Sequence, residues 1–172
     1  GLFGWTFTKP PFPGIEFNFV APAMMDGVPV VLKLAPPFER TEIYSEAKYL
    51  KVRNGEGGVR LIVEDRGRHA FLMERVLPGE ALFNRFENAP ADIVQPAIDV
   101  LRAVLRPPPA DLTDVHSLDN WFENFRRYKE TEFPRHYADK AFEIYERLSG
   151  QPGRTFYLHG DFHPGNIVTT DW

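Results

Sequence analysis

Apolar residues in the first half of the chain follow an order that predicts two β-hairpins. In FNFVAPAMMDGVPVVLKLA, residues 17–35, two apolar runs flank the pair Asp26-Gly27. Asp-Gly favours the tight turn of a hairpin because both residues accept the positive φ angles that this turn requires. The segment VRLIVEDRGRHAFLMERV, residues 59–76, repeats the order of apolar run, turn and apolar run. It is predicted to form the second hairpin.

Between the hairpins the apolar spacing changes to that of a helix. Ile43, Ala47 and Leu50 stand at positions i, i+4 and i+7 within the segment 36–52. This spacing places the three side chains on one face of an amphipathic helix. The glycine-rich sequence NGEGG that follows predicts the end of this helix.

Helical patterns dominate the second half of the chain. A helix is predicted over residues 91–106, ended by three consecutive prolines that cannot continue it. Two further helices are predicted over residues 117–133 and 134–150. The connecting sequence LPGEAL, residues 77–82, is predicted to be a turn. Strands and helices that are segregated in this way indicate an α+β fold, or two lobes that meet near residues 76–79.

The composition of the 172-residue chain is that of a folded protein, with 43% hydrophobic and 14% aromatic residues. The net charge is -4 and no run of lysine or arginine is present, which argues against a nucleic-acid partner. The acidic excess suits a cationic small molecule. No apolar run is long enough to span a bilayer, so no membrane partner is expected. The lack of cysteine excludes disulfides and thiolate chemistry and fits a cytoplasmic location.

The strongest candidate for chemistry is the loop in YLHGDFHPGNIV, residues 157–168. Asp161 stands two residues after His159, and Asn166 stands five residues after Asp161. This is the spacing of the protein-kinase catalytic loop, H-R-D-x-x-x-x-N. In that loop a carboxylate accepts the proton of the attacking hydroxyl, while an amide oxygen holds magnesium against the phosphates. The apolar runs on both sides predict flanking strands that keep the loop rigid.

Two other interpretations of this loop stay open. Asp, Asn, Pro and Gly are ordinary turn residues, so Asp161 and Asn166 would in the first case only satisfy backbone groups. In the second case the alternating His159, Asp161 and His163 would bind zinc.

A kinase also needs a lysine on a strand and a carboxylate on the next helix. The sequence VVLK, which ends at Lys33, parallels the V-A-I-K element whose lysine grips the α- and β-phosphates. Its partner is expected at Glu46, which borders the predicted buried face of the helix, or one turn earlier at Glu42. Taken singly, a lysine on a strand is more often a solvated edge residue, and either glutamate is equally well explained as an ordinary surface charge of a helix.

Four segments follow one another in the order strand lysine, helix glutamate, lobe break and aspartate loop: FNFVAPAMMDGVPVVLKL, SEAKYL, LMERVLPGEAL and YLHGDFHPGNIV. Together they resemble the aminoglycoside phosphotransferase superfamily of small-molecule kinases, and most closely its streptomycin kinase and hydroxyurea-resistance kinase branch. The resemblance covers nearly the whole chain. It implies a bilobal protein-kinase-like fold, with residues 1–76 as an antiparallel-sheet N-lobe that binds the nucleotide. Residues 77–172 would be the first part of a helical C-lobe.

The resemblance also implies roles for individual residues. Asp161 would be the catalytic base and Asn166 a magnesium ligand. Lys33 would contact the phosphates of ATP, and Glu46 would hold Lys33 in place.

The adenine of ATP would, by the same resemblance, lie against the strand AFLMERV. Backbone groups near Glu74 and Val76 would meet the base. Met73 would lie at the back of the pocket, although in an alternating strand it is equally a core residue. His159 would support the catalytic loop through hydrogen bonds, and His163 would either line the cleft or have a structural role.

Departures from the protein-kinase pattern favour a small-molecule kinase. GIEFNFVAPAMMDG stands where a protein kinase has the loop G-x-G-x-x-G. Gly160 replaces the arginine of H-R-D, which removes a docking charge for a phosphorylated activation loop. A second metal-binding aspartate is expected on the strand after the catalytic loop. Asp171 lies too close to Asn166 for that role, so the chain is expected to be a truncated part of a longer kinase.

The leading hypothesis is therefore ATP- and magnesium-dependent transfer of a γ-phosphoryl group to a hydroxyl of a small molecule. The acceptor is expected to be an aminoglycoside such as streptomycin, with antibiotic resistance as the biological role. A second hypothesis is a nucleotide-binding module that is catalytically incomplete. A third is a zinc hydrolase that uses His159, Asp161 and His163.

Overall fold

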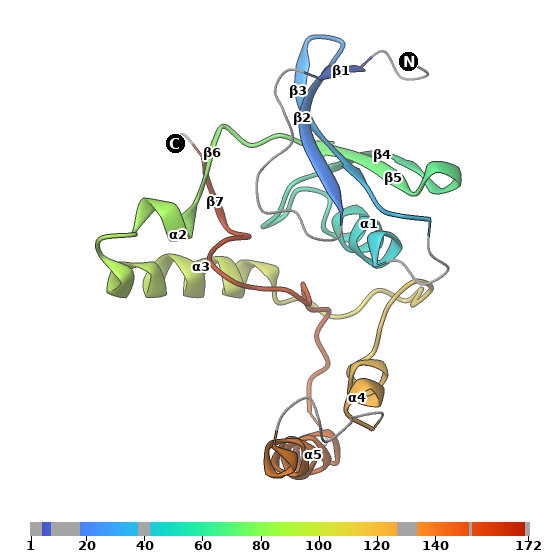
Figure 1. Cartoon of the computed structure of the whole chain (residues 1–172), viewed down its shortest axis with the longest axis vertical. Helices are drawn as coiled ribbons and strands as arrows, with labels where there is room; N and C mark the ends of the chain where they lie inside the picture. Colours follow the sequence, from blue (N-terminus) through green and yellow to red (C-terminus); the bar gives the residue numbers. More distant parts are fainter. Residues whose placement is uncertain (1–4, 8–17, 38–41, 127–133, 152, 171–172) are drawn as a thin grey trace.

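The computed structural model describes residues 5–7, 18–37, 42–126, 134–151 and 153–170. Its first half is a five-stranded sheet with the strand order β1-β2-β3-β5-β4, in which all neighbours are antiparallel (Figure 1). The strands are β1 (Trp5–Phe7), β2 (Phe19–Met25), β3 (Val28–Leu34), β4 (Leu61–Asp65) and β5 (Ala70–Glu74).

Both predicted hairpins are confirmed. β2 and β3 pair over all seven residues of each strand. The turn between them has φ angles of 50° at Asp26 and 80° at Gly27, as a two-residue hairpin turn requires. β4 and β5 form the second hairpin and are joined by the 3-10 turn η1 (Arg66–Arg68).

The predicted amphipathic helix is α1 (Ile43–Arg53), which lies against one face of the sheet (Figure 1). The side chains predicted to face inward are buried, with 2% exposure at Ile43, 1% at Ala47 and 7% at Leu50. They form one apolar cluster with Phe71 of β5. Burial of this face against the sheet is what holds the helix in position.

The segment LPGEAL is not the simple turn that was predicted. Its residues Pro78–Ala81 form strand β6, which pairs with β7 (Val168–Thr170) near the other end of the described chain. The local Pro-Gly signal indicates a turn, and only the partner strand, far away in sequence, makes the segment extended. Gly79 is needed there because its φ is +71° and a Cβ would lie 2.6 Å from the carbonyl oxygen of Val76.

The part of the chain beyond β6 is mainly helical, as predicted. Its elements are α2 (Leu82–Arg85), the 3-10 turn η2 (Pro90–Ile93), α3 (Val94–Val104), α4 (Leu118–Arg126) and α5 (Arg135–Ser149). The predicted helix over residues 117–133 is confirmed as far as residue 126, and its end lies outside the described residues. α4 and α5 pack through Phe122, which stacks on Tyr145 with 4.0 Å between ring centroids.

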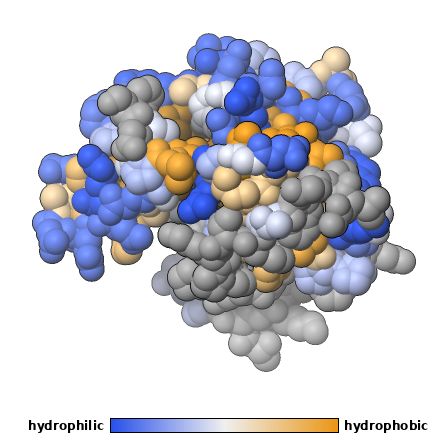
Figure 2. All heavy atoms as spheres, turned by 90° about the horizontal axis from the view of Figure 1, so that it is seen from above, coloured by the Kyte–Doolittle hydropathy of each residue, from blue (hydrophilic) through white to orange (hydrophobic). Residues whose placement is uncertain are grey.

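The surface of the described residues is mixed. On the face drawn in Figure 2, hydrophilic residues form much of the rim and hydrophobic residues gather nearer the middle. In the part of the chain that the structure describes, no helix combines the length and the apolar character that crossing a membrane requires.

Candidate active site

Lys33 and Glu46 are brought together as predicted. Lys33 lies near the end of β3, flanked in register by β2 and β5, and its ammonium group is 2.5 Å from Oε2 of Glu46 on α1. The Lys33 side chain is only 18% exposed, so its ammonium group is confined to a narrow range of positions. Glu42, the alternative partner, is the N-cap residue of α1, and its carbonyl accepts a hydrogen bond from the N–H of Glu46.

Asp161 and Asn166 are also brought together, within their own loop. The amide nitrogen Nδ2 of Asn166 donates to the backbone carbonyl of Asp161 at 2.9 Å and to its carboxylate Oδ2 at 2.8 Å. If the amide were flipped, Oδ1 of Asn166 would face the carbonyl and carboxylate oxygens of Asp161, which would repel it. Nδ2 therefore makes these two hydrogen bonds, and Oδ1 of Asn166 is left to bind another group. The Asp161 side chain is 78% exposed and open to an incoming group.

Asn166 therefore fits the metal-ligand role. Its free Oδ1 is a neutral oxygen donor, and oxygen donors are what Mg²⁺ prefers. The neighbouring carboxylate of Asp161 adds negative charge on the same side of the loop. These two oxygen donors on one loop suit magnesium.

The two histidines of the loop support its backbone. Nδ1 of His159 accepts from the N–H of Asp161 at 3.3 Å, and Nδ1 of His163 accepts from the N–H of Gly165 at 3.1 Å. The loop-supporting contact expected of His159 is thus present. Within the described ranges, no group of three or more His, Asp or Glu side chains is arranged to hold a metal ion. The zinc hypothesis accordingly gains no support.

Among the residues that the structure describes, only one of the two strands expected to flank this loop is present. β7 follows the loop, as predicted. Before it, Tyr157 makes an isolated bridge in which its N–H donates to the carbonyl of Arg106 at 2.8 Å. The loop is instead fixed by the start of α2, where the N–H of Leu82 donates to Ile167 at 2.8 Å and the N–H of Phe83 donates to Pro164 at 3.2 Å. These partners lie about 80 residues earlier, beyond the reach of local sequence patterns.

Helix α1 connects Lys33 to the loop of Asp161 through Tyr49, a residue that the sequence analysis did not single out. Tyr49 lies three residues after Glu46 and is 5% exposed. Its ring meets the rings of Tyr157 and His159 edge-on, each at a centroid distance of 5.3 Å. The one available signal was its position beside the apolar positions 47 and 50 of the predicted helix.

Burial alters the acidity of both tyrosines. It raises the pKa of the Tyr157 phenol to about 12, with further raising contributions from Tyr49 and Asp114. It also raises the pKa of the Tyr49 phenol, against the opposing charge of Arg53. Both hydroxyls are buried without a hydrogen-bond partner among the described residues. The two rings therefore act here as apolar packing groups, not as proton donors.

The predicted adenine segment lies at the end of β5. Met73 is partly buried, pairs in register with Val31, and packs against the cluster under α1. The N–H of Glu74 donates to the carbonyl of Arg60 at 2.8 Å, so that donor is already used within the sheet. Val76 lies two residues beyond the strand.

These features define a kinase-like arrangement: a strand lysine paired with a helix glutamate, followed by a loop that carries Asp and Asn five residues apart. A family model for aminoglycoside/hydroxyurea antibiotic resistance kinases matches residues 16–172. The chain belongs to this family.

The solved structures that are similar to this chain include two nucleotide complexes. One is spectinomycin phosphotransferase, APH(9)-Ia, in complex with ADP and spectinomycin, with 14% identity and a TM-score of 0.44 over 97% of this chain and 60% of that one. The other is Rad53, residues 1–466, in complex with AMP-PNP, with 18% identity and a TM-score of 0.42 over 58% of this chain and 30% of that one. The chain thus spans less than two thirds of either structure. A comparison with curated protein sequences gave no match.

Proposed function

We propose that the protein is an ATP-dependent phosphotransferase that moves the γ-phosphoryl group to a hydroxyl of a small molecule. Residues 1–76 would form its nucleotide-binding lobe, and residues 77–172 the part of its second lobe that carries the catalytic loop. The observation that carries the proposal is that α1 contacts both Lys33, through Glu46, and the catalytic loop, through Tyr49 and His159. The family match supports the same conclusion.

Lys33 would bind the phosphates of ATP. Its ammonium group neutralises part of their negative charge, and Glu46 keeps its side chain in one position. Magnesium would be held by Oδ1 of Asn166 and would supply further charge stabilisation at the phosphates. The adenine would lie beside Met73 and the backbone near Glu74 and Val76.

Asp161 would act on the acceptor hydroxyl. Its Oδ2 is used by Asn166, which leaves the exposed Oδ1 to accept the hydroxyl proton. As the acceptor oxygen bonds to the γ-phosphorus, the bond from that phosphorus to the β-γ bridging oxygen breaks and ADP leaves. The proton passes to Asp161 and then to solvent, so the products are the phosphorylated acceptor, ADP and a proton.

The acceptor would be an aminoglycoside such as streptomycin. The family description names aminoglycosides and hydroxyurea, and the net charge of -4 suits a cationic acceptor. The use of ATP and the absence of cysteine fit a cytoplasmic enzyme.

The direct test replaces the proposed base. Asp161→Ala is expected to lower kcat by about 10²- to 10⁴-fold while the affinity for ATP stays near that of the wild type, because Lys33 is untouched. Asp99→Ala, an exposed aspartate of α3, is the matched control and is expected to retain activity. Near-normal transfer by the Asp161 variant would refute the assignment.

Two assays separate the alternatives. A wild-type protein that binds ATP in the presence of magnesium but transfers no phosphate to any of a panel of aminoglycosides would be the catalytically incomplete module. Stoichiometric zinc in the purified protein would favour the hydrolase.

A further inference from the structure

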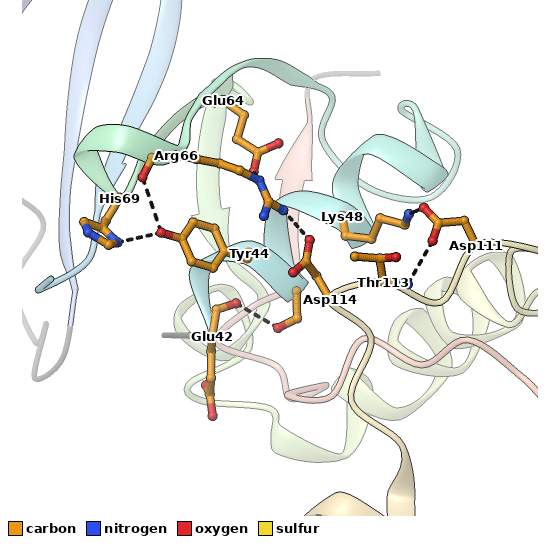
Figure 3. Close-up of polar contacts among 10 residues, drawn as sticks. Glu42, Tyr44, Lys48, Glu64, Arg66, His69, Asp111, Thr113 and Asp114 are labelled. Atoms are coloured by element: carbon orange, nitrogen blue, oxygen red, sulfur yellow. Dashed lines mark hydrogen bonds and ion pairs between the residues drawn. The ribbon is translucent and has the colours of Figure 1, made fainter. Parts of the chain in front are cut away.

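Helix α1 is anchored to the second half of the chain by an ion pair that the proposed function does not use. Nζ of Lys48 contacts Oδ2 of Asp111, in the segment between α3 and α4 (Figure 3). The Lys48 side chain is only 16% exposed and stands between the buried residues Ala47 and Tyr49. A lysine held so closely has a defined direction, unlike a surface lysine that samples many rotamers.

The carboxylate of Asp111 is held in place by its own turn as well as by Lys48. Its Oδ1 accepts a hydrogen bond from the N–H of Thr113 at 2.9 Å, which closes a turn around the aspartate. The pKa of Asp111 lies well below its ordinary value; the hydrogen bond from Lys48 is the largest cause, and those from Thr113 come next. Asp111 is therefore charged at all physiological pH values.

A second contact joins the same segment to the sheet. Asp114 pairs with Arg66 of η1, whose Nε also contacts Glu64 at 2.8 Å. The guanidinium of Arg66 lies over the ring of Tyr44 on α1, 4.7 Å from its centroid. Figure 3 shows that these side chains come from α1, from β4 and η1, and from the segment after α3.

Segment 111–115 also packs into the core. Val115 lies against the cluster that contains Ile43, Ala47 and Tyr49 of α1 and Tyr157 beside the catalytic loop. The segment thus contacts α1 through the charge at 111 and Arg66 of η1 through the charge at 114, and it packs against the cluster under α1 through the apolar side chain at 115. We call residues 111–115 the clasp.

The clasp bears on chemistry because of where Lys48 stands. It lies two residues after Glu46, the partner of Lys33, and one before Tyr49, which contacts His159 of the catalytic loop. A rigid helix that loses its hold at Lys48 would shift at both neighbouring positions. Small displacements of catalytic groups have large effects on rate.

We propose that the clasp is a positioning element, in which Asp111 and Asp114 hold α1 so that Glu46 keeps Lys33 engaged. Asp111 acts through Lys48, and Asp114 acts through Arg66 and Tyr44. This inference rests on the proposed function, because it gives Lys48 and Asp111 a role in binding ATP.

Charge reversal tests the clasp. Lys48→Glu and Asp111→Lys are each expected to raise the KM for ATP by about three- to tenfold, and to leave the KM for the acceptor unchanged. The double variant Lys48→Glu/Asp111→Lys restores opposite charges and is expected to recover most of the loss. Asp114→Asn, which removes charge with little change of shape, is expected to shift the KM for ATP in the same direction.

The matched control is the pair Lys140 and Glu143 on α5, an exposed Lys–Glu contact of 2.7 Å within one helix. Reversing either charge there is expected to leave both KM values unchanged. Thermal melting of every variant shows whether it is folded.

Amide hydrogen exchange over residues 43–53 gives a readout that does not depend on activity. Exchange is expected to become faster in the single Lys48 and Asp111 variants and to slow again in the double variant. If the single reversals leave both the exchange of α1 and the KM for ATP at wild-type values, the inference is wrong. It is also wrong if the double variant stays as impaired as the single ones, because the residues would then be structural only.

The two proposals fail separately. A near-normal kcat in the Asp161→Ala variant overturns the proposed function, whereas the exchange of α1 still tests the clasp. Wild-type exchange of α1 together with a wild-type KM for ATP in the clasp variants overturns the clasp, whereas an inactive Asp161 variant still supports the function.

Discussion

The two halves of the molecule bury their apolar residues in different ways. The sheet and α1 contain most of the buried hydrophobic residues, in clusters on the two faces of the sheet. In α4 and α5, by contrast, large apolar side chains such as Leu118 (60%), Tyr137 (61%) and Leu148 (58%) are exposed. Lys33 and Glu46 therefore stand on a scaffold with its own core. The loop of Asp161 obtains its position from contacts with other elements, such as the start of α2.

The two proposed catalytic groups reflect this difference. Lys33 is 18% exposed and is fixed by a strand and one ion pair. Asp161 is 78% exposed and is fixed by hydrogen bonds inside its own turn. Changes in the sheet are expected to act mainly on stability, and changes in the loop mainly on turnover.

The largest expected effect is on the core of the sheet. Phe71→Ala removes a ring that is 2% exposed, and it is expected to lower the free energy of unfolding by about 3–5 kcal/mol. Phe83→Ala, at a ring that is 61% exposed, is the control, and its expected change is below about 0.5 kcal/mol. Urea unfolding measures both. Equal losses would show that the sheet does not hold the main core.

The next effect is on the catalytic loop. Asn166→Ala removes both hydrogen bonds to Asp161, and it is expected to lower kcat by about a hundredfold because the carboxylate is no longer oriented. The melting temperature is expected to change little, since these bonds are exposed. Asn88→Ala, at an exposed asparagine between α2 and η2, serves as the control. A variant that is less stable but keeps its turnover per folded molecule would show that the loop acts on stability and not on turnover.

The smallest effect concerns Tyr157, where the halves meet. Its folded pKa of about 12 exceeds the ordinary 10.0, so ionisation of this phenol leaves the free energy of unfolding unchanged below pH 10 and lowers it as the pH rises from 10 through 12. Tyr157→Phe is expected to remove this alkaline loss. Because the hydroxyl has no partner among the described residues, the variant is also expected to be more stable at neutral pH, by up to about 1 kcal/mol. Unfolding curves from pH 8 to pH 12 check both statements. An unchanged alkaline loss in the variant would place its origin elsewhere.

Most of the local structure was predictable from the sequence. Asp26-Gly27 specified its hairpin turn because few residues accept positive φ. Ile43, Ala47 and Leu50 specified the buried face of α1 because their spacing matches the helical period. The pair of Lys33 and Glu46 was also predicted, from the order of strand and helix.

The predictions that were wrong concern segments whose partners are far away along the chain. Pro78–Ala81 reads locally as a turn and becomes a strand only because β7 pairs with it. The residues before Tyr157 read as a strand, yet only one bridge forms, to Arg106. The contact of Tyr49 with His159 could not be predicted, because a helical tyrosine beside apolar residues looks like any other core residue.

The sequence by itself determined the hairpin turns, the buried face of α1 and the identity of the chemical groups, since these depend on the φ preference, spacing and functional groups of neighbouring residues. Only the tertiary structure decided which helix links Lys33 to the loop of Asp161, and that residues 111–115 fasten this helix. Such contacts depend on the free energy of packing between segments far apart along the chain. No local pattern encodes that quantity.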